Sequence, residues 1–286
     1  IVDGDLVITP ASVAVVKIEG HTKTVTYNGK EQTVEGYTIT SNPANATVTL
    51  VGKAVASGTD ANTYPMGLSA ANFTATSPNY ENVHVEVTDG YLKINPITDK
   101  VTVTVTEKSD TVVYDTNEHF ITGYETMTAN NALYDVKTNV AETQTAAWTA
   151  KGTDVGEYPV GIKAGDFENT SSNFTNVEFV IVDGALKIAP AESIVVKIAG
   201  NTKTVTYNGE EQSVEGYTVT SNPANADVTL VGKAVAAGTD ANTYPMGLKS
   251  SDFTATSPNY KKITIEVTDG WLKIDPIADK VTVTVT

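Results

Sequence analysis

The stretch that decides the fold runs from residue 83 to residue 96 and reads Val-His-Val-Glu-Val-Thr-Asp-Gly-Tyr-Leu-Lys-Ile-Asn-Pro. Apolar and polar residues alternate on both sides of Asp89-Gly90, and a period of two is typical of strands that bury one face. Val83, Val85 and Val87 are therefore predicted to face a core. Because Asp-Gly favours a two-residue turn, the stretch predicts a hairpin of two paired strands.

The same stretch occurs three times, because the sequence is a tandem repeat. Residues 15–106 align without a gap on residues 195–286, with roughly one position in five different. A more divergent unit between them keeps the same anchors and carries seven extra residues between Gly123 and Gly152. The anchors of the first unit are Tyr27, Gly36, Tyr37, Tyr64-Pro65, Phe73, Asn79-Tyr80 and Asp89-Gly90, which correspond to Tyr114, Gly123, Tyr124, Tyr158-Pro159, Phe167, Asn173-Phe174 and Asp183-Gly184.

These repeats set the predicted domain organisation. The divisions are residues 1–12 as the last strand of a preceding repeat, 13–100 as repeat one, 101–193 as the divergent repeat two, 194–280 as repeat three and 281–286 as the first strand of a following repeat. Residues 1–6 resemble 181–186, and residues 281–286 repeat 101–106. We therefore expect this chain to be a window on a longer array.

Each repeat is predicted to be all-β. In repeat one, strands are expected at about 13–18, 22–27, 34–40, 47–53, 62–67, 83–88 and 91–95. Seven short strands with almost no helix favour an immunoglobulin-like β-sandwich. A β-grasp fold is the alternative, although it needs a longer helix where residues 68–73 allow a single turn. The joins contain Pro and no flexible Gly/Ser run, so the array is expected to be elongated.

The composition narrows the classes of function. The chain has 19 Lys and no Arg against 34 Asp and Glu, which gives a net charge of −15, so nucleic acid is not an expected partner. It has no Cys, which excludes disulfides, zinc ribbons and thiol catalysis. Without a run of about 18 apolar residues, no membrane insertion is expected. No nucleophile motif or recurring His and Asp pair is present, so we do not expect an enzyme.

Metal and cofactor sites have weak support in the sequence. His21 and His84 are replaced by Asn201 and Thr264 in the nearly identical third repeat, and His119 lies in another context, which indicates surface histidines. No cofactor is expected. Asp99 and Glu192 stand near the two joins, where their carboxylates could help to bind an inter-repeat calcium ion.

A Lys–Asn isopeptide bond inside each repeat is a further possibility that the sequence leaves open. Lys93, Lys187 and Lys273 recur in Leu-Lys-Ile. The alternation of side chains puts each lysine on the face opposite its apolar neighbours, which favours a solvated amine.

Three aromatic residues are the candidates for a ligand-binding site. Tyr91 and Trp271 follow Asp-Gly, where the middle repeat has Ala185, and Trp148 falls in the inserted segment. An exposed aromatic ring has an apolar face on which a sugar ring stacks, so Tyr91, Trp148 and Trp271 are predicted to contact a glycan if the repeats bind one.

The segments Tyr27 to Tyr37 and Asp89 to Pro96 resemble the MBG and YDG repeats of bacterial cell-surface adhesins, and the resemblance covers essentially the whole chain. The middle repeat departs from it, with Tyr114-Asp115-Thr116 in place of Tyr-Asn-Gly. The resemblance implies a long extracellular protein of the bacterial cell surface or cell wall, with host glycans or mucin and neighbouring repeats as partners. Two functions follow: a non-catalytic stalk or spacer, and alternatively a glycan- or mucin-binding adhesion module that acts through multivalency.

Overall fold

The computed structural model describes residues 3–144 and 148–285, and its regular structure consists almost entirely of strands. The chain forms two compact units. The first comprises Ile1–Thr106, Tyr124–Thr145 and Ile162–Val182, and the second comprises Glu107–Gly123, Ala146–Gly161 and Asp183–Thr286. Repeat one with part of repeat two therefore belongs to the first unit, and the rest of repeat two belongs with repeat three to the second.

The elements follow one order in each repeat. Repeat one contains β1 (Ala11–Gly20), β2 (Thr22–Thr26), β3 (Gln32–Glu35), β4 (Tyr37–Ser41), β5 (Thr47–Leu50), β6 (Val55–Gly58), β7 (Asn62–Pro65), η1 (Ala70–Asn72), β8 (Phe73–Thr76), β9 (Tyr80–Thr88) and β10 (Tyr91–Asn95). Repeat two contains β11 (Val101–Glu107), β12 (Asp110–Val113), β13 (His119–Thr122), β14 (Tyr124–Ala129), α1 (Val136–Asn139), β15 (Val140–Glu142), β16 (Thr149–Gly152), β17 (Gly156–Pro159), η2 (Ala164–Asp166), β18 (Phe167–Asn169), β19 (Val177–Val182) and β20 (Ala185–Ala189). Repeat three contains β21 (Ala191–Gly200), β22 (Thr202–Thr206), β23 (Gln212–Glu215), β24 (Tyr217–Ser221), β25 (Asp227–Leu230), β26 (Val235–Gly238), β27 (Thr243–Pro245), η3 (Ser250–Asp252), β28 (Phe253–Thr256), β29 (Tyr260–Thr268) and β30 (Trp271–Asp275).

In repeat one, the first and last parts of the chain run parallel to each other. β1 pairs with β9 from Ala11 opposite Tyr80 onward, and β2 pairs with β10 as far as Thr26 opposite Asn95. β4 adds to β1 and β7 adds to β10, both antiparallel, which gives the three-stranded sheets β4–β1–β9 and β2–β10–β7. Because β1 leads directly into β2 and β9 into β10, these two sheets lie end to end in one layer. The antiparallel pairs β3–β6 and β5–β8 form the second layer.

The core of repeat one lies between these two layers. One cluster joins Val16 of β1 to Phe73 of β8, and a second joins Leu92 of β10 to Ala56 of β6. Burying a Val or Leu side chain contributes about 1.5–3 kcal/mol, so these contacts hold the layers together. The predicted core face of β9 is confirmed, because Val83, Val85 and Val87 pack against the first cluster.

The chain is thus a tandem array of immunoglobulin-like β-sandwich repeats. The longer helix that the β-grasp alternative requires is not present in repeat one, where η1 spans only three residues. The parallel pairing of first and last strands is a departure from the antiparallel sheets of the immunoglobulin fold. Strands β6 and β8 were not predicted, and the predicted strand 34–40 is divided at Gly36, whose φ is +93°.

The predicted hairpin at Asp89-Gly90 is wrong. β9 and β10 do not pair with each other. Instead the chain passes from β9 straight into β10, while the parallel neighbour passes from β1 into β2 at Gly20-His21 beside it. Alternation identifies a strand and its buried face, but it carries no information about which strand is the partner.

Gly90 is required because, at this point, the backbone between β9 and β10 touches the backbone between β1 and β2. A Cβ on Gly90 would lie 2.4 Å from the carbonyl oxygen of His21 and 2.7 Å from the carbonyl carbon of Gly20. The corresponding Gly184 and Gly270 are enclosed as tightly by backbone atoms, at 2.3 and 2.5 Å. Only glycine lets another backbone approach this closely.

The aspartate before this glycine fixes a second segment. The Asp89 carboxylate accepts hydrogen bonds from the backbone N–H groups of Gly67 at 3.0 Å and Leu68 at 2.8 Å, where the chain leaves β7. Asp269 makes the same two bonds in repeat three. The recurring Asp-Gly therefore marks the point where two parallel backbones come into contact, and it does not form a turn.

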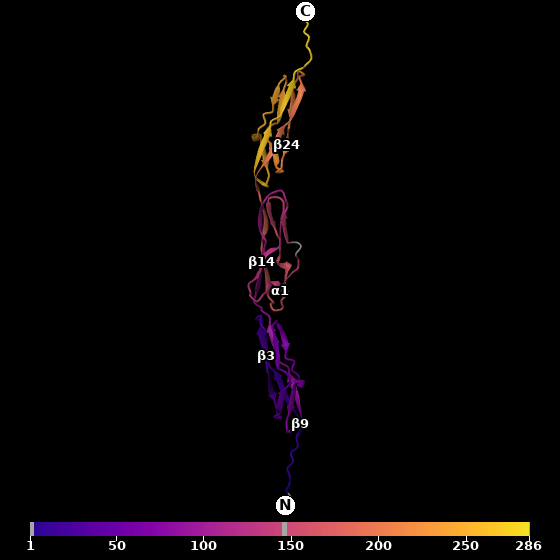
Figure 1. Ribbon diagram of the computed structural model, residues 1–286, viewed down its shortest axis with the longest axis vertical. Helices are drawn as coiled ribbons and strands as arrows, with labels where there is room; N and C mark the ends of the chain where they lie inside the picture. The colour runs from indigo at the N-terminus through magenta and orange to yellow at the C-terminus, as the bar shows by residue number, and fades with distance from the viewer. Residues whose placement is uncertain (1–2, 145–147, 286) are drawn as a thin grey trace. The chain divides into compact units, whose positions relative to one another are not determined.

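The inserted segment of repeat two forms the single α-helical turn among the described residues. α1 packs beside β14 (Figure 1), and the Asp135 side chain caps it by accepting a hydrogen bond from the Lys137 N–H at 3.0 Å. Residues 145–147 of the inserted segment lie outside the described residues.

The strands predicted at the two ends of the chain are not formed by the residues that the structure describes there. Residues 3–10 and 276–285 adopt no regular structure, while residues 1, 2 and 286 lie outside the described residues. A β-strand is stabilised by hydrogen bonds to a neighbouring strand, and these segments have none here. No helix within residues 3–144 and 148–285 is long and apolar enough to cross a membrane.

We predict that Gly90→Ala destabilises repeat one by about 1–3 kcal/mol or more, because the new methyl group overlaps backbone atoms that cannot move independently. Gly165→Ala is the matched control, since a Cβ there meets nothing within 4 Å, and a change within about 0.5 kcal/mol is expected. Urea denaturation gives the stabilities, and amide hydrogen exchange in β1 and β9 locates the effect. Equal stability of the two variants would contradict the close contact between the two backbones at Gly90.

Candidate functional site

The structure places the three aromatic candidates in different environments. Tyr91 begins β10 opposite Pro65 of β7 and is 39% exposed, and Trp271 begins β30 opposite Pro245 and is partly exposed. Trp148 is only 5% exposed, which corrects its expected role as a surface ring. Two rings, one in each compact unit, therefore stay available for stacking on a ligand.

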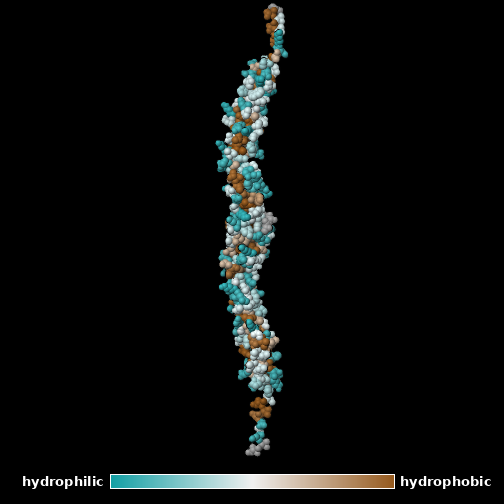
Figure 2. Space-filling model, viewed as in Figure 1, coloured by the Kyte–Doolittle hydropathy of each residue, from teal (hydrophilic) through white to brown (hydrophobic). Residues whose placement is uncertain are grey.

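Hydrophobic residues do not gather into a broad surface on the face drawn in Figure 2. They form short patches separated by neutral and hydrophilic residues. Large exposed apolar patches are what mark an extensive protein–protein or membrane contact, so this face has the character of a solvated surface.

The most elaborate polar arrangement in the first unit lies where repeat one meets repeat two. The Asn173 side chain there bonds two groups of repeat one. Its Oδ1 accepts from the backbone N–H of Ala61 at 2.6 Å, and its Nδ2 donates to a carboxylate oxygen of Asp60 at 2.9 Å. An amide side chain suits this position because it carries an acceptor and a donor side by side.

An aromatic contact and the linker complete this first junction. The buried ring of Phe174 meets Tyr27 of repeat one edge to face, with ring centroids 5.7 Å apart. The linker residue Ile97 donates its N–H to the Asn173 carbonyl at 2.8 Å and accepts from the Thr175 N–H at 3.1 Å. Side chains and backbone thus hold the two repeats at several points.

The second unit contains the same arrangement where repeat two meets repeat three. The buried Asn259 accepts from the Val155 N–H and donates to an Asp154 carboxylate oxygen, both at 2.8 Å. Tyr260 meets Tyr114 edge to face, with centroids 5.4 Å apart. The linker Ala191 donates its N–H to the Asn259 carbonyl at 2.9 Å, which corresponds to the bond of Ile97 in the first junction.

Each junction therefore joins two kinds of edge, which we name by their polar residue. The Asp edge consists of Tyr27, Asp60 and Ala61 in repeat one and of Tyr114, Asp154 and Val155 in repeat two. The Asn edge consists of Asn173 and Phe174 in repeat two and of Asn259 and Tyr260 in repeat three.

A tyrosine in each repeat holds the Asp edge in place. The Tyr64 hydroxyl donates to the Asp60 carbonyl at 2.9 Å, and Tyr158 does the same for Asp154. The Tyr64 ring occupies space that a side chain at Gly58 would need, because a Cβ there would lie 2.2 Å from the ring. The recurring glycine and tyrosine thus orient the loop that carries the aspartate.

The residues of the two junctions recur visibly in the sequence, but only the structure reveals their role in joining repeats. Asn79-Tyr80 and its counterparts stand out only as anchors of the repeat. The available signal was an asparagine that stays beside an aromatic residue in all three repeats. Periodicity could not reveal that its partner lies in the preceding repeat.

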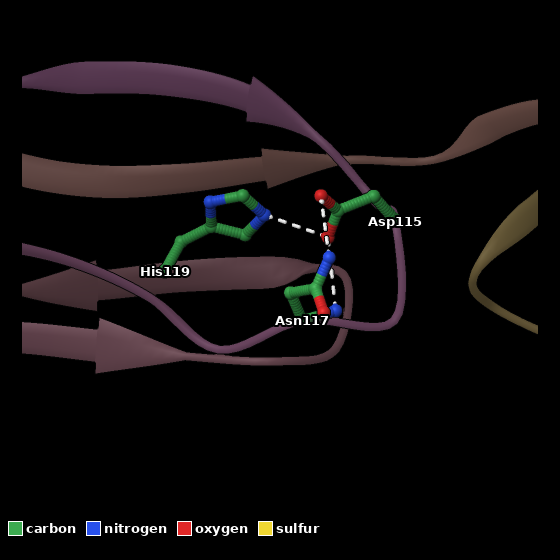
Figure 3. Close-up of polar contacts among 3 residues, drawn as sticks. All are labelled: Asp115, Asn117 and His119. Atoms are coloured by element: carbon green, nitrogen blue, oxygen red, sulfur yellow. Dashed lines mark hydrogen bonds and ion pairs between the residues drawn. The ribbon is translucent and has the colours of Figure 1, made fainter.

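A smaller polar cluster follows β12 in repeat two and is drawn in Figure 3. The Asp115 carboxylate accepts from the Asn117 N–H at 2.9 Å and from the Asn117 side-chain amide at 3.1 Å, and it lies 2.8 Å from His119 Nε2. The Asn117 backbone bond, the Asn117 side-chain bond and the His119 bond, in that order, lower the pKa of Asp115 to about 2. The cluster closes the turn at Thr116, whose φ is +74°.

The residues considered for calcium binding and for isopeptide bonds lie at the surface. Within residues 3–144 and 148–285, no three His, Cys, Asp or Glu side chains come together in a way that would hold a metal. Glu192 forms an ion pair with Lys261, and Asp99 is exposed. The three lysines of the Leu-Lys-Ile segments are exposed as predicted, namely Lys93, Lys187 and Lys273.

We predict that Asn173→Ala lowers stability by about 1–3 kcal/mol, because it leaves the Ala61 N–H and Asp60 without their shared partner. Asn79→Ala is the matched control, since the equivalent Asn79 side chain has no hydrogen bond among the described residues, and a change within about 0.5 kcal/mol is expected. Urea denaturation of both variants checks this. Equal effects of the two substitutions would show that the side-chain hydrogen bonds of Asn173 contribute nothing to stability.

The Asp115 carboxyl is expected to titrate near pH 2 in a carbon-detected NMR experiment. Because its folded pKa lies below the ordinary value of 3.8, ionised Asp115 stabilises the fold above about pH 4, and this contribution is lost as the pH falls through 2. Asn117→Ala should raise the midpoint by removing one donor. A midpoint near 3.8 in the unaltered chain would contradict the cluster.

The comparisons with known proteins give no family. No protein-family model and no curated protein matches the chain. Among solved structures, it is similar to the N-terminal four Ig domains of Dscam1 isoform 9.44, at 11% identity over 91% of this chain and 73% of that chain, with a TM-score of 0.19. It is also similar to the I9–I11 tandem of titin, at 11% identity over 92% of this chain and 100% of that chain, with a TM-score of 0.18. TM-scores of this size support no inference about what the chain does.

Proposed function

We propose that the chain is a non-catalytic stalk or spacer segment of a bacterial cell-surface adhesin, located outside the cell. The observation that carries this proposal is the repetition of one junction. Asn173 and Asn259 make the same pair of hydrogen bonds to the preceding repeat, at two joins whose repeats otherwise differ. The same contacts at both junctions are what we expect of a chain that keeps its repeats at a fixed spacing.

The composition and the resemblance to adhesin repeats support the same role. The excess of Asp and Glu gives a net charge of −15, so separate copies repel one another. Each junction adds a nearest-neighbour term to the stability of the repeats that it joins, as in other repeat proteins, and this term limits bending at the linker.

Small-angle scattering tests the spacer role. Strands rise about 3.3 Å per residue, so three repeats in line are expected to span roughly 100 Å. The Asn173→Ala, Asn259→Ala double variant should have a broader distribution of sizes and a smaller mean dimension, because both amide clamps are removed. A compact particle for the unaltered chain would refute the proposal.

The second candidate function is a glycan- or mucin-binding module in which each repeat binds weakly and several repeats bind together. It is favoured by the 39% exposed ring of Tyr91 and by the partly exposed Trp271 at the same position of repeat three. A glycan array and a mucin pull-down with the intact chain separate the two functions.

Binding through these rings predicts that Tyr91→Ala and Trp271→Ala each weaken capture, and that the double variant abolishes it. Phe120→Ala is the matched control, because Phe120 is an exposed ring, at 67%, outside the candidate positions. Absence of binding by the unaltered chain would eliminate the module and leave the spacer. Equal losses in all three single variants would point to nonspecific adhesion.

A further inference from the structure

The Asp edge of repeat three is built like the other two, but it is open. Tyr207, which corresponds to Tyr27 and Tyr114, is 36% exposed and has no ring partner among the described residues. Asp240 and Ala241 are exposed, and within the described part of the chain neither the carboxylate nor the Ala241 N–H has a hydrogen-bond partner.

The loop that carries Asp240 in this open edge has the same geometry as the loops of the two occupied Asp edges. The Tyr244 hydroxyl donates to the Asp240 carbonyl at 3.0 Å, as Tyr64 does for Asp60. A Cβ on Gly238 would lie 2.2 Å from the Tyr244 ring, so the same packing of glycine against tyrosine orients the loop. Its donor and acceptor are therefore fixed in place before any partner binds.

The Asn edge of repeat one is its counterpart. Asn79 is exposed, and its side-chain amide makes no hydrogen bond among residues 3–144 and 148–285. The backbone part of a junction is nevertheless formed here, because Ala11 after Pro10 donates its N–H to the Asn79 carbonyl at 2.9 Å. The linker residues Ile97 and Ala191 make this same bond in the two occupied junctions.

We infer that the open Asp edge of repeat three binds a further repeat of the middle type, through the same contacts that Asn173 and Phe174 make with repeat one. The partner follows from chemistry on both sides. Tyr207, Asp240 and Ala241 reproduce the Tyr, Asp and Ala that accept the middle repeat in the first junction. The Asn edge of repeat one is the matching half for a repeat on its other side.

This inference rests on the proposed spacer function, and it adds a rule for which surfaces join. Association needs one asparagine amide, which satisfies the free Ala241 N–H and the Asp240 carboxylate together, and one ring, which covers Tyr207. The linker holds the next repeat at high effective concentration, so contacts as few as these are sufficient.

Amide hydrogen exchange, measured by NMR, tests the inference with internal standards. In the chain as it stands, the Ala61 and Val155 amides are bonded to asparagine and are expected to exchange slowly, while the Ala241 amide exchanges quickly. Residues 107–193 are then appended after Thr286, so that residues 281–286 act as the first strand of a fourth repeat. The Ala241 amide is expected to exchange at least about 10-fold more slowly in this extended chain.

An Asn173→Ala substitution in the appended copy alone is the matched control, and it should restore fast exchange at Ala241. Unchanged exchange at Ala241, with Ala61 and Val155 still protected, would overturn the inference and leave the spacer function intact. Fast exchange at Ala61 and Val155 would instead remove the basis of the spacer function itself.

A reciprocal extension covers the case in which the appended copy does not fold. Residues 101–180 are placed before Ile1, so that residues 1–9 take the place of residues 181–189 and complete the last strand of an added middle repeat. Asn79 is then expected to protect the Val155 amide of the added copy, and Asn79→Ala to expose it. Protection lost in the variant supports the inference, and no protection in either chain refutes it.

Discussion

The structure of each repeat depends on one close approach, that of the backbone at Gly90 to the backbone at Gly20 and His21. Because a Cβ at Gly90 would meet the His21 carbonyl oxygen at 2.4 Å, two parallel strands can pass each other here only without a side chain. The long first strand and the long last strand then stay paired along β1 with β9 and β2 with β10. Both core clusters are built on these four segments, and the linkers of the junctions continue from their ends.

Much of this fold could be predicted from the sequence, and its failures have a common physical cause. The alternation of apolar and polar residues predicted most strands and correctly predicted that Val83, Val85 and Val87 face the core, because burial on one face is a local property. The pairing at Asp89-Gly90 could not be predicted in the same way. Asp-Gly is favoured in tight turns and also where one carboxylate caps a loop and one backbone touches another, and only the partner strand distinguishes the two.

The candidate site shows the same limit more strongly. Trp148 looked like a surface ring, yet it is buried, since a side chain in an inserted segment can fold back on the core. Asn173 and Asn259 were visible only as recurring residues. Their meaning depends on Asp60 and Asp154, more than 100 positions earlier in the chain, and a single repeat considered alone contains no sign of that contact.

The parallel pairing of first and last strands also determines how a repeat responds to tension. In repeat one, the chain enters at the start of β1 and leaves at the end of β10, so a pull on the two ends slides the parallel strands past each other along their length. The evenly spaced hydrogen bonds of a parallel ladder then carry the load together. A hairpin pulled from its two free ends would instead open one bond at a time. The parallel pairing thus places the hydrogen bonds between the first and last strands of a repeat in shear when its two ends are pulled.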